Sequence, residues 1–143
     1  MSGAPKRFVS SGSPFEAAAG YSRAVIESGL VHVSGTTGFD YASMTIADDV
    51  VEQARQCLRN IGAALAEAGC TLDDVVRVRY LLTDAGDFAR VAPLFGEAFA
   101  RARPAATAMV VGLIDARMRI EIEATARVPA GILPPAAFDP STA

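Results

Sequence analysis

The sequence of 143 residues lacks several features that large classes of protein need. It has no tryptophan, and aromatic residues make up 7% of it, which leaves little material for a surface that stacks nucleic-acid bases. The formal net charge is −3 and the pI is about 5.1, whereas nucleic-acid-binding domains are typically basic. These shortages argue against a nucleic-acid partner.

Histidine, cysteine and long apolar runs are equally scarce. With only His32, Cys57 and Cys70, we expect no disulfide framework, no metal ion and no other cofactor. No apolar run approaches the roughly 18 residues of a membrane span, and the first twenty residues contain no secretory signal. We therefore expect a cytoplasmic protein without a membrane partner.

Length and composition predict one domain over residues 1–128. A tail follows at 129–143, and it holds four of the eight prolines. We expect this proline-rich C-terminal tail to be extended or disordered.

Hydrophobic periodicity predicts an α+β domain with the order ββ-α-β-α-ββ. The expected strands are 21–26, 30–35, 75–82, 107–112 and 118–128, and the expected helices are 48–68 and 87–101. Ser28-Gly29 is a hairpin turn signal. Pro93 interrupts the second helical pattern, so we expect the regular helix to begin near it.

Two helices cover only one face of such a sheet, yet apolar residues occupy both faces of its strands. In the strand 107–112, Met109 and Val111 share one face, while Ala108 and Val110 share the other. In the strand 75–82, Val76, Val78, Tyr80 and Leu82 share the predicted core face. Val75 and Leu81 lie opposite them. We expect the second face to be buried in a homo-oligomer.

The last strand alternates regularly between apolar and polar residues. Ile120, Ile122, Ala124 and Ala126 are expected to pack under the helices, which places Glu121 and Glu123 on the opposite face. One interpretation is a ladder of cross-strand ion pairs with Arg77 and Arg79. The other is that one glutamate lines a cleft and handles a proton or a water.

Two further segments carry polar groups that could bind a ligand. Tyr21 and Arg23 share a strand face, where a phenol and a guanidinium together could hold a small carboxylate. An ordinary strand-end pair is the alternative. The loop from Ser34-Gly35 to Gly38 offers hydroxyls and backbone N–H groups to an anion, although it matches no P-loop and could be a plain turn.

The order of short motifs over about residues 20–127 resembles the Rid family, the reactive intermediate deaminases, also called YjgF-like proteins. The motifs are Gly20-Tyr21, Val33-Ser34-Gly35, the helix 53–61, Ala68-Gly69, Asp74 to Val78, Leu82-Thr83-Asp84, Asp87-Phe88, Arg103-Pro104-Ala105 and Ile120 to Ala124. The resemblance implies a chorismate-mutase-like fold. It also implies a mixed sheet of about six strands with two helices on one face. The third implication is a homotrimer with clefts between subunits.

The resemblance also implies a reaction, in which water attacks a 2-imino or 2-enamino acid to give a 2-keto acid and ammonia. Glu121 matches the glutamate that positions or activates the water, Tyr21 matches a cleft tyrosine, and Ser34-Gly35 match the cleft backbone. Ala106 stands where deaminases carry the arginine that binds the substrate carboxylate. Ala92 and Ala108 replace a helix asparagine and a cysteine of the family.

These departures lead to competing functional hypotheses. The first is a homotrimer that binds a small anionic metabolite without efficient deamination, because losing one partner of a buried charge pair costs roughly 2–5 kcal/mol. The alternative is an imine or enamine hydrolase in which Arg23 replaces the missing arginine, with Arg101, Arg103 and Arg119 as further candidates. A ribonuclease or translation-inhibitor role is disfavoured by the acidic charge balance.

Overall fold

The computed structural model describes residues 5–130, so residues 131–143 of the predicted tail lie outside the described residues. The strands are β1 (Arg7–Val9), β2 (Ala24–Glu27), β3 (Leu30–Thr37), β4 (Phe39–Asp40), β5 (Thr45–Ile46), β6 (Val75–Leu82), β7 (Ala105–Val110) and β8 (Ile120–Arg127). The helices are α1 (Pro14–Ala19), α2 (Val50–Glu67) and α3 (Phe88–Ala98), with 3-10 turns at Leu72–Asp74 and Ala85–Asp87. The α+β class is confirmed.

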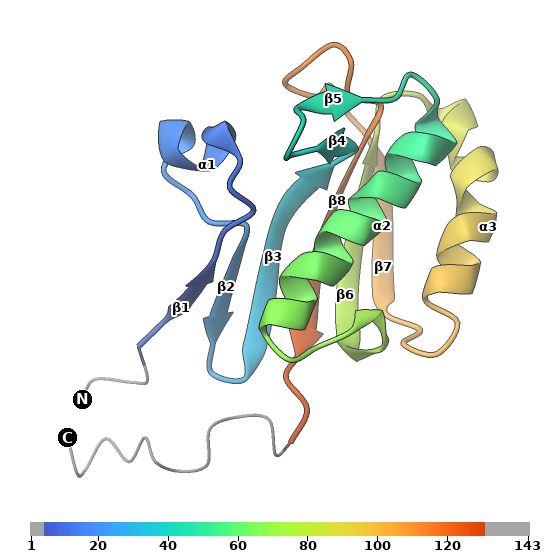
Figure 1. Ribbon diagram of the computed structural model, residues 1–143. Coiled ribbons are helices and arrows are strands. Elements are labelled where there is room, and N and C mark those ends of the chain that lie inside the picture. The colour runs from blue at the N-terminus through green and yellow to red at the C-terminus, as the bar shows by residue number, and fades with distance from the viewer. Residues whose placement is uncertain (1–4, 131–143) are drawn as a thin grey trace, which may run out of the picture.

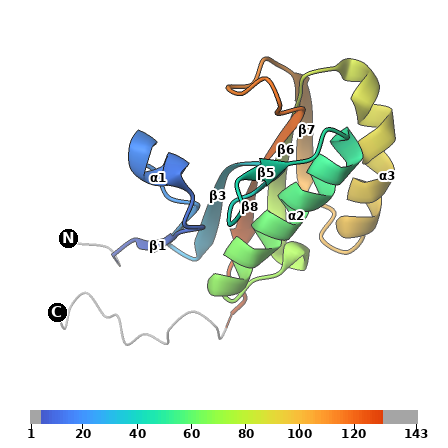
Figure 2. The ribbon, with the colours of Figure 1, turned by 45° about the horizontal axis from the view of Figure 1, so that its top comes forward.

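Six strands form one mixed sheet in the order β1-β2-β3-β8-β6-β7. All neighbours are antiparallel except β6 and β7, which run parallel and are joined by a crossover through α3. The helices α2 and α3 cover one face, while α1 lies apart from them, beyond β2 and β3 (Figures 1 and 2). The predicted sheet with two helices on one face is therefore confirmed.

The helix α2 supplies much of the core. Its apolar stripe includes Ile61 and Leu65, both fully buried, as the spacing of three and four residues predicts. Asp49, one residue after the predicted start, caps the helix by accepting a hydrogen bond from the Glu52 N–H. Gly69 follows the helix with a φ of 76°, the left-handed conformation that favours glycine.

The predicted hairpin turn is confirmed. Ser28 and Gly29 both have positive φ, at 51° and 79°. They join β2 to β3, with Glu27 and Leu30 paired across the turn. Two consecutive positive φ values match the type I′ turn that suits the twist of paired strands.

Several predicted details differ from the structure. The strand predicted over 21–26 is β2, and it begins at Ala24 rather than at Tyr21; the short helix α1 and its Gly20 cap occupy the chain just before it. Val75 is buried and Val76 is 47% exposed, the reverse of the predicted alternation. An irregular register between Val75 and Arg77 explains this difference, because a bulge leaves one residue unpaired.

Pro93 lies inside α3 rather than at its start. A 3-10 turn comes first, as predicted, but the regular helix already begins at Phe88. Pro93 and Ala89, whose carbonyl loses its helical partner, are both exposed. Water can therefore satisfy this carbonyl, which makes the proline tolerable.

Candidate functional site

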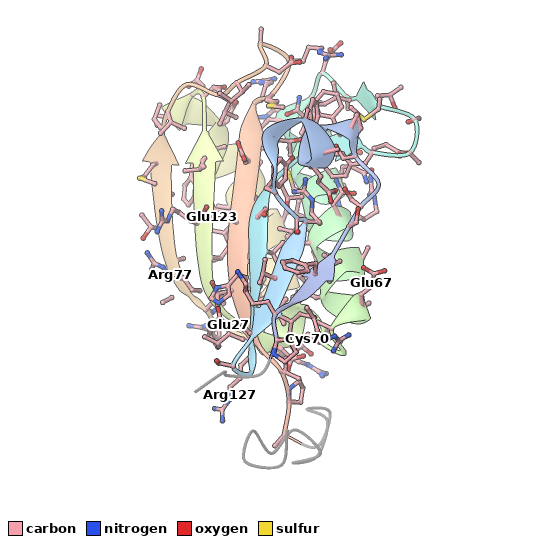
Figure 3. The ribbon with its side chains drawn as sticks, turned by 90° about the vertical axis from the view of Figure 1, so that its left-hand side faces the viewer. Glu27, Glu67, Cys70, Arg77, Glu123 and Arg127 are labelled. Atoms are coloured by element: carbon pink, nitrogen blue, oxygen red, sulfur yellow. The ribbon has the colours of Figure 1, made fainter. Side chains whose placement is uncertain are left out.

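A cavity of about 620 Å³ opens on the side of β3 and β8 that faces away from α2. Its polar lining includes Tyr21, Ser34, Gly35 and Glu121. These are four of the six site residues predicted from the sequence. Figure 3 faces this side of the sheet and labels Arg77 and Glu123 farther down the same surface.

A β-bulge shapes the cavity at Ser34 and Gly35. Val33 pairs with Ala124, but Thr36 pairs with Ile122, so β3 carries one residue more than β8 in this interval. Such bulges redirect side chains and recur beside functional sites. The Ser34 hydroxyl donates a hydrogen bond to the Ser22 carbonyl at 2.6 Å, which fixes the bulge against the chain before β2.

Glu121 presents its carboxylate directly to this bulge. A Cβ added at Gly35 would lie 2.9 Å from the Glu121 Cδ and closer still to Oε1. Among residues 5–130, no side chain or backbone group donates a hydrogen bond to this carboxylate, whereas Glu123 pairs with Arg79 at 3.1 Å. Burial raises the pKa of Glu121; the positive charge of Arg23 opposes this shift, and the negative charge of Glu123 adds to it.

Arg23 lies behind the cavity rather than along its wall. The side chain is 2% exposed, and its Nη1 donates to the Gly35 carbonyl at 2.8 Å and to the Thr36 hydroxyl at 3.1 Å. The guanidinium stacks 4.8 Å from the Tyr41 ring centre. Arg23 therefore holds the bulge in place and brings a positive charge near Glu121 without reaching into the space before it.

Tyr21 forms one edge of the cavity and is 37% exposed. Its hydroxyl accepts a weak hydrogen bond of 3.4 Å from Arg23 Nη2. Burial raises the pKa of Tyr21, and the charge of Arg23 opposes that shift. The phenol is therefore neutral at physiological pH and can donate a hydrogen bond to a ligand.

Ala106 is not near these residues within the single chain. It lies on β7, the edge strand at the far end of the sheet, and pairs with the buried Val78. Its nearest cavity is a separate one that Tyr80 and Phe95 also line. One chain therefore does not bring Ala106 to the cavity that contains Glu121.

Cys57 and His32 lie outside the cavity that contains Glu121. Cys57 is fully buried and donates its S–H to the Thr36 carbonyl, and burial raises the pKa of its thiol. His32 is exposed on β3.

Within residues 5–130, no group of three or more His, Cys, Asp or Glu side chains is arranged to hold a metal ion. No helix in the same range is both long and apolar enough to cross a membrane.

Sequence patterns did not predict the rest of the cavity lining, which is largely apolar. It is formed by Phe15, Ala18 and Ala19 of α1 and by Ile114 and Met118 of the loop before β8. The signal for α1 is present in the sequence, because Ser13-Pro14 is a helix start and Gly20 a helix end. A helix of six residues is too short to show a hydrophobic period.

Comparisons with known proteins identify the family of this chain. Residues 11–128 match the family model described as endoribonuclease L-PSP. The goat (Capra hircus) protein named 2-iminobutanoate/2-iminopropanoate deaminase is 37% identical over 127 residues, which are 88% of this chain and 93% of that protein.

Solved structures show the same fold. A YjgF/YER057c/UK114 family protein of Mycobacterium tuberculosis is 44% identical with a TM-score of 0.79, over 87% of this chain and all of that one. RidA of an Antarctic Psychrobacter is 34% identical with a TM-score of 0.72, over 76% of this chain and 88% of that one. With a family match across residues 11–128 and these relatives, the chain belongs to the endoribonuclease L-PSP family, also known as the YjgF or Rid family.

Proposed function

We propose that this chain hydrolyses 2-imino acids to 2-keto acids and ammonia in the cavity that contains Glu121. The observation that carries the proposal is the Glu121 carboxylate, which faces the cavity at Gly35 without a hydrogen-bond donor among residues 5–130. The deaminase name of the goat protein, which is 37% identical, supports the same chemistry.

In the proposed reaction, Glu121 acts as the general base. It accepts a proton from water as the water oxygen bonds to the imine carbon and the C=N electron pair moves to nitrogen. Glu121 then returns this proton to the nitrogen, which gives a carbinolamine. In the second stage Glu121 transfers the carbinolamine's hydroxyl proton to the amine nitrogen, the C–N bond breaks as the C=O bond forms, and ammonia leaves.

The other residues position the substrate and the base. Tyr21 and the backbone of Ser34 and Gly35 bound the polar side of the cavity. The sequence predicts that Arg23 contacts the ligand's anionic group. In the proposed site, the positive charge of Arg23 attracts a small carboxylate from behind the cavity. Its hydrogen bonds go to Gly35 and Thr36, so direct contact would require these bonds to rearrange.

The assembly proposed for this function is a homotrimer with its clefts between subunits. Ala106 lies on the edge strand β7, far from the cavity of its own chain. In a closed ring, a residue on such an edge can meet the site of the next subunit. The proposed location is the cytosol, which suits two buried, unpaired cysteines.

A second candidate is metabolite binding without efficient turnover. It is favoured by Ala106, which stands where the family resemblance implies an arginine. Loss of a carboxylate-binding arginine lowers transition-state binding by about 30-fold to several thousand-fold if no other group replaces it. The clefts would then hold a small anionic metabolite as a sensor does.

The deciding experiment measures ammonia release from 2-iminobutyrate generated in place by a coupled enzyme, in wild type and in Glu121→Gln. We expect the wild type to accelerate release and the variant to lose this acceleration. The wild-type rate should fall, as pH drops, around a value above the ordinary pKa of glutamate, because burial raises the pKa of Glu121. Glu121→Gln should lack this acid limb.

The stability of the variant separates catalysis from folding. A glutamate whose folded-state pKa is raised destabilises the protein when it ionises, so this cost is absent at low pH and present above its raised pKa. Glu121→Gln should therefore be at least as stable as wild type at pH 7 by thermal unfolding. Absence of any acceleration by wild type would leave the binding candidate.

A further inference from the structure

The lining of the cavity that contains Glu121 combines two kinds of surface. Tyr21, Ser34 and Glu121 provide polar groups, while α1 and Met118 provide an apolar wall. A small charged ligand needs only the polar groups. The apolar wall therefore points to an apolar part of the ligand.

The wall formed by α1 is anchored rather than loosely attached. Ser13 caps the helix by accepting from the Phe15 N–H at 3.2 Å, and Gly20 ends it in the left-handed conformation. The buried Glu16 accepts hydrogen bonds from the backbone N–H and the hydroxyl of Ser11. A wall fixed in this way presents its apolar surface without an ordering cost on binding.

A second anchor is aromatic. Phe15 meets the buried Phe39 edge-to-face, with ring centres 5.9 Å apart. The helix then leads within two residues into Tyr21, whose N–H donates to the Glu16 carbonyl at 3.1 Å. The apolar wall and the polar edge are thus parts of one local unit.

The size of the cavity exceeds what the smallest 2-imino acids occupy. A four-carbon imino acid has seven non-hydrogen atoms, which take up about 210 Å³ even at the ~30 Å³ that a water occupies in the liquid. Within one chain, the cavity measures about 620 Å³. Alanines at positions 18 and 19, rather than larger residues, keep this space open beside the wall.

We propose that α1 forms a side-chain subsite that makes this chain prefer 2-imino acids with bulky apolar side chains, and that Ala18 determines this specificity. The inference rests on the proposed hydrolase function. It also offers a source of binding energy in a chain with alanine at position 106, because each buried CH₂ group strengthens binding by about fourfold.

The test compares kcat/KM for the imino acids derived from alanine, 2-aminobutyrate and leucine, each generated in place by an amino-acid oxidase. The leucine-derived substrate has three more side-chain carbons than the alanine-derived one, so we expect a preference of at least tenfold. Ala18→Leu should lower that preference by tenfold or more by filling the subsite, with little effect on the alanine-derived substrate.

The matched control is Ala17→Leu, the same change on the same helix at an exposed position that does not line the cavity. It should retain the wild-type preference, and thermal unfolding should show both variants folded. Equal kcat/KM values for all three substrates in wild type, or equal preferences in the two variants, would overturn the subsite.

A binding measurement keeps the subsite testable if no imino acid is turned over. Calorimetry with 4-methyl-2-oxopentanoate and pyruvate, the products from leucine- and alanine-derived imines, should show tighter binding of the larger acid by wild type and Ala17→Leu only. This pattern without turnover would reject the hydrolase and retain the subsite. No difference between the two acids would reject the subsite itself.

Discussion

At Gly35, the place of a side chain is taken by the carboxylate of Glu121. A Cβ there would lie 2.9 Å from the Glu121 Cδ, a separation at which one group has to move. We expect Gly35→Ala to displace the flexible glutamate rather than the backbone, and to lower ammonia release by about 100-fold, the cost of misplacing a catalytic group by about 1 Å. The assay of the proposed function measures this loss.

The matched control for this variant is Gly62→Ala. Gly62 lies within α2, and a Cβ there meets no atom within 4 Å. This change should preserve activity and raise stability by about 0.5–1 kcal/mol, because alanine favours a helix interior over glycine. Full activity of Gly35→Ala would contradict the position assigned to Glu121.

Residue patterns could predict some of these side chains and not others. Glu121 follows from the alternation of the last strand, since Ile120 and Ile122 are both fully buried. The position of Arg23 could not be predicted, because the Gly35 carbonyl to which it donates has no signature in the sequence. The bulge that turns this carbonyl toward Arg23 is likewise visible only in the strand register.

At the scale of elements, Gln53 joins α2 to the start of β8. Its side chain is fully buried; Nε2 donates to the Ala47 and Arg117 carbonyls, and Oε1 accepts from the Arg119 N–H, at 2.7–2.8 Å. We expect Gln53→Leu to destabilise the protein by about 3 kcal/mol or more, because it leaves three backbone groups without partners at about 1–3 kcal/mol each. Urea unfolding measures this change.

Gln56→Leu is the control for that substitution. Gln56 lies one turn later on α2 and is half-buried; among residues 5–130, its side chain hydrogen-bonds only to the side chains of Asn60 and Arg59. Its replacement should cost under about 1 kcal/mol. If both variants lost the same stability, the three hydrogen bonds of Gln53 would not be what ties β8 to the helix layer.

Long elements with a regular period were predictable, and short ones were not. The apolar stripe of α2 and the positive φ pair at Ser28 and Gly29 follow from local sequence. The pairing of β7 with β6 could not be derived in this way, since it depends on the crossover through α3. The bulge at Val76 exchanged the expected faces of Val75 and Val76, because one inserted residue shifts the alternation locally.

At the scale of the whole molecule, the sheet leaves apolar side chains on the face opposite α2 and α3. Met109 is 37% exposed and Val76 is 47% exposed. Met109 pairs with Leu81, which is half-buried, and lies among charged neighbours that include Arg79 and Glu123. Apolar positions mixed with satisfied charges are typical of a surface that a second copy covers.

We expect this face to form the interface of the proposed homotrimer, and Met109→Glu to disrupt it. Burying a methionine contributes about 1.5–3 kcal/mol per subunit, whereas the substitution places a carboxylate in each copy of the interface. Light scattering at micromolar concentration should give wild type a mass near three times 14.9 kDa and the variant a lower mass. Ala66→Glu on α2, exposed away from the sheet, should remain trimeric. A monomeric wild type would leave the cavity around Glu121 to function within one chain, which would also exclude any role for Ala106 in it.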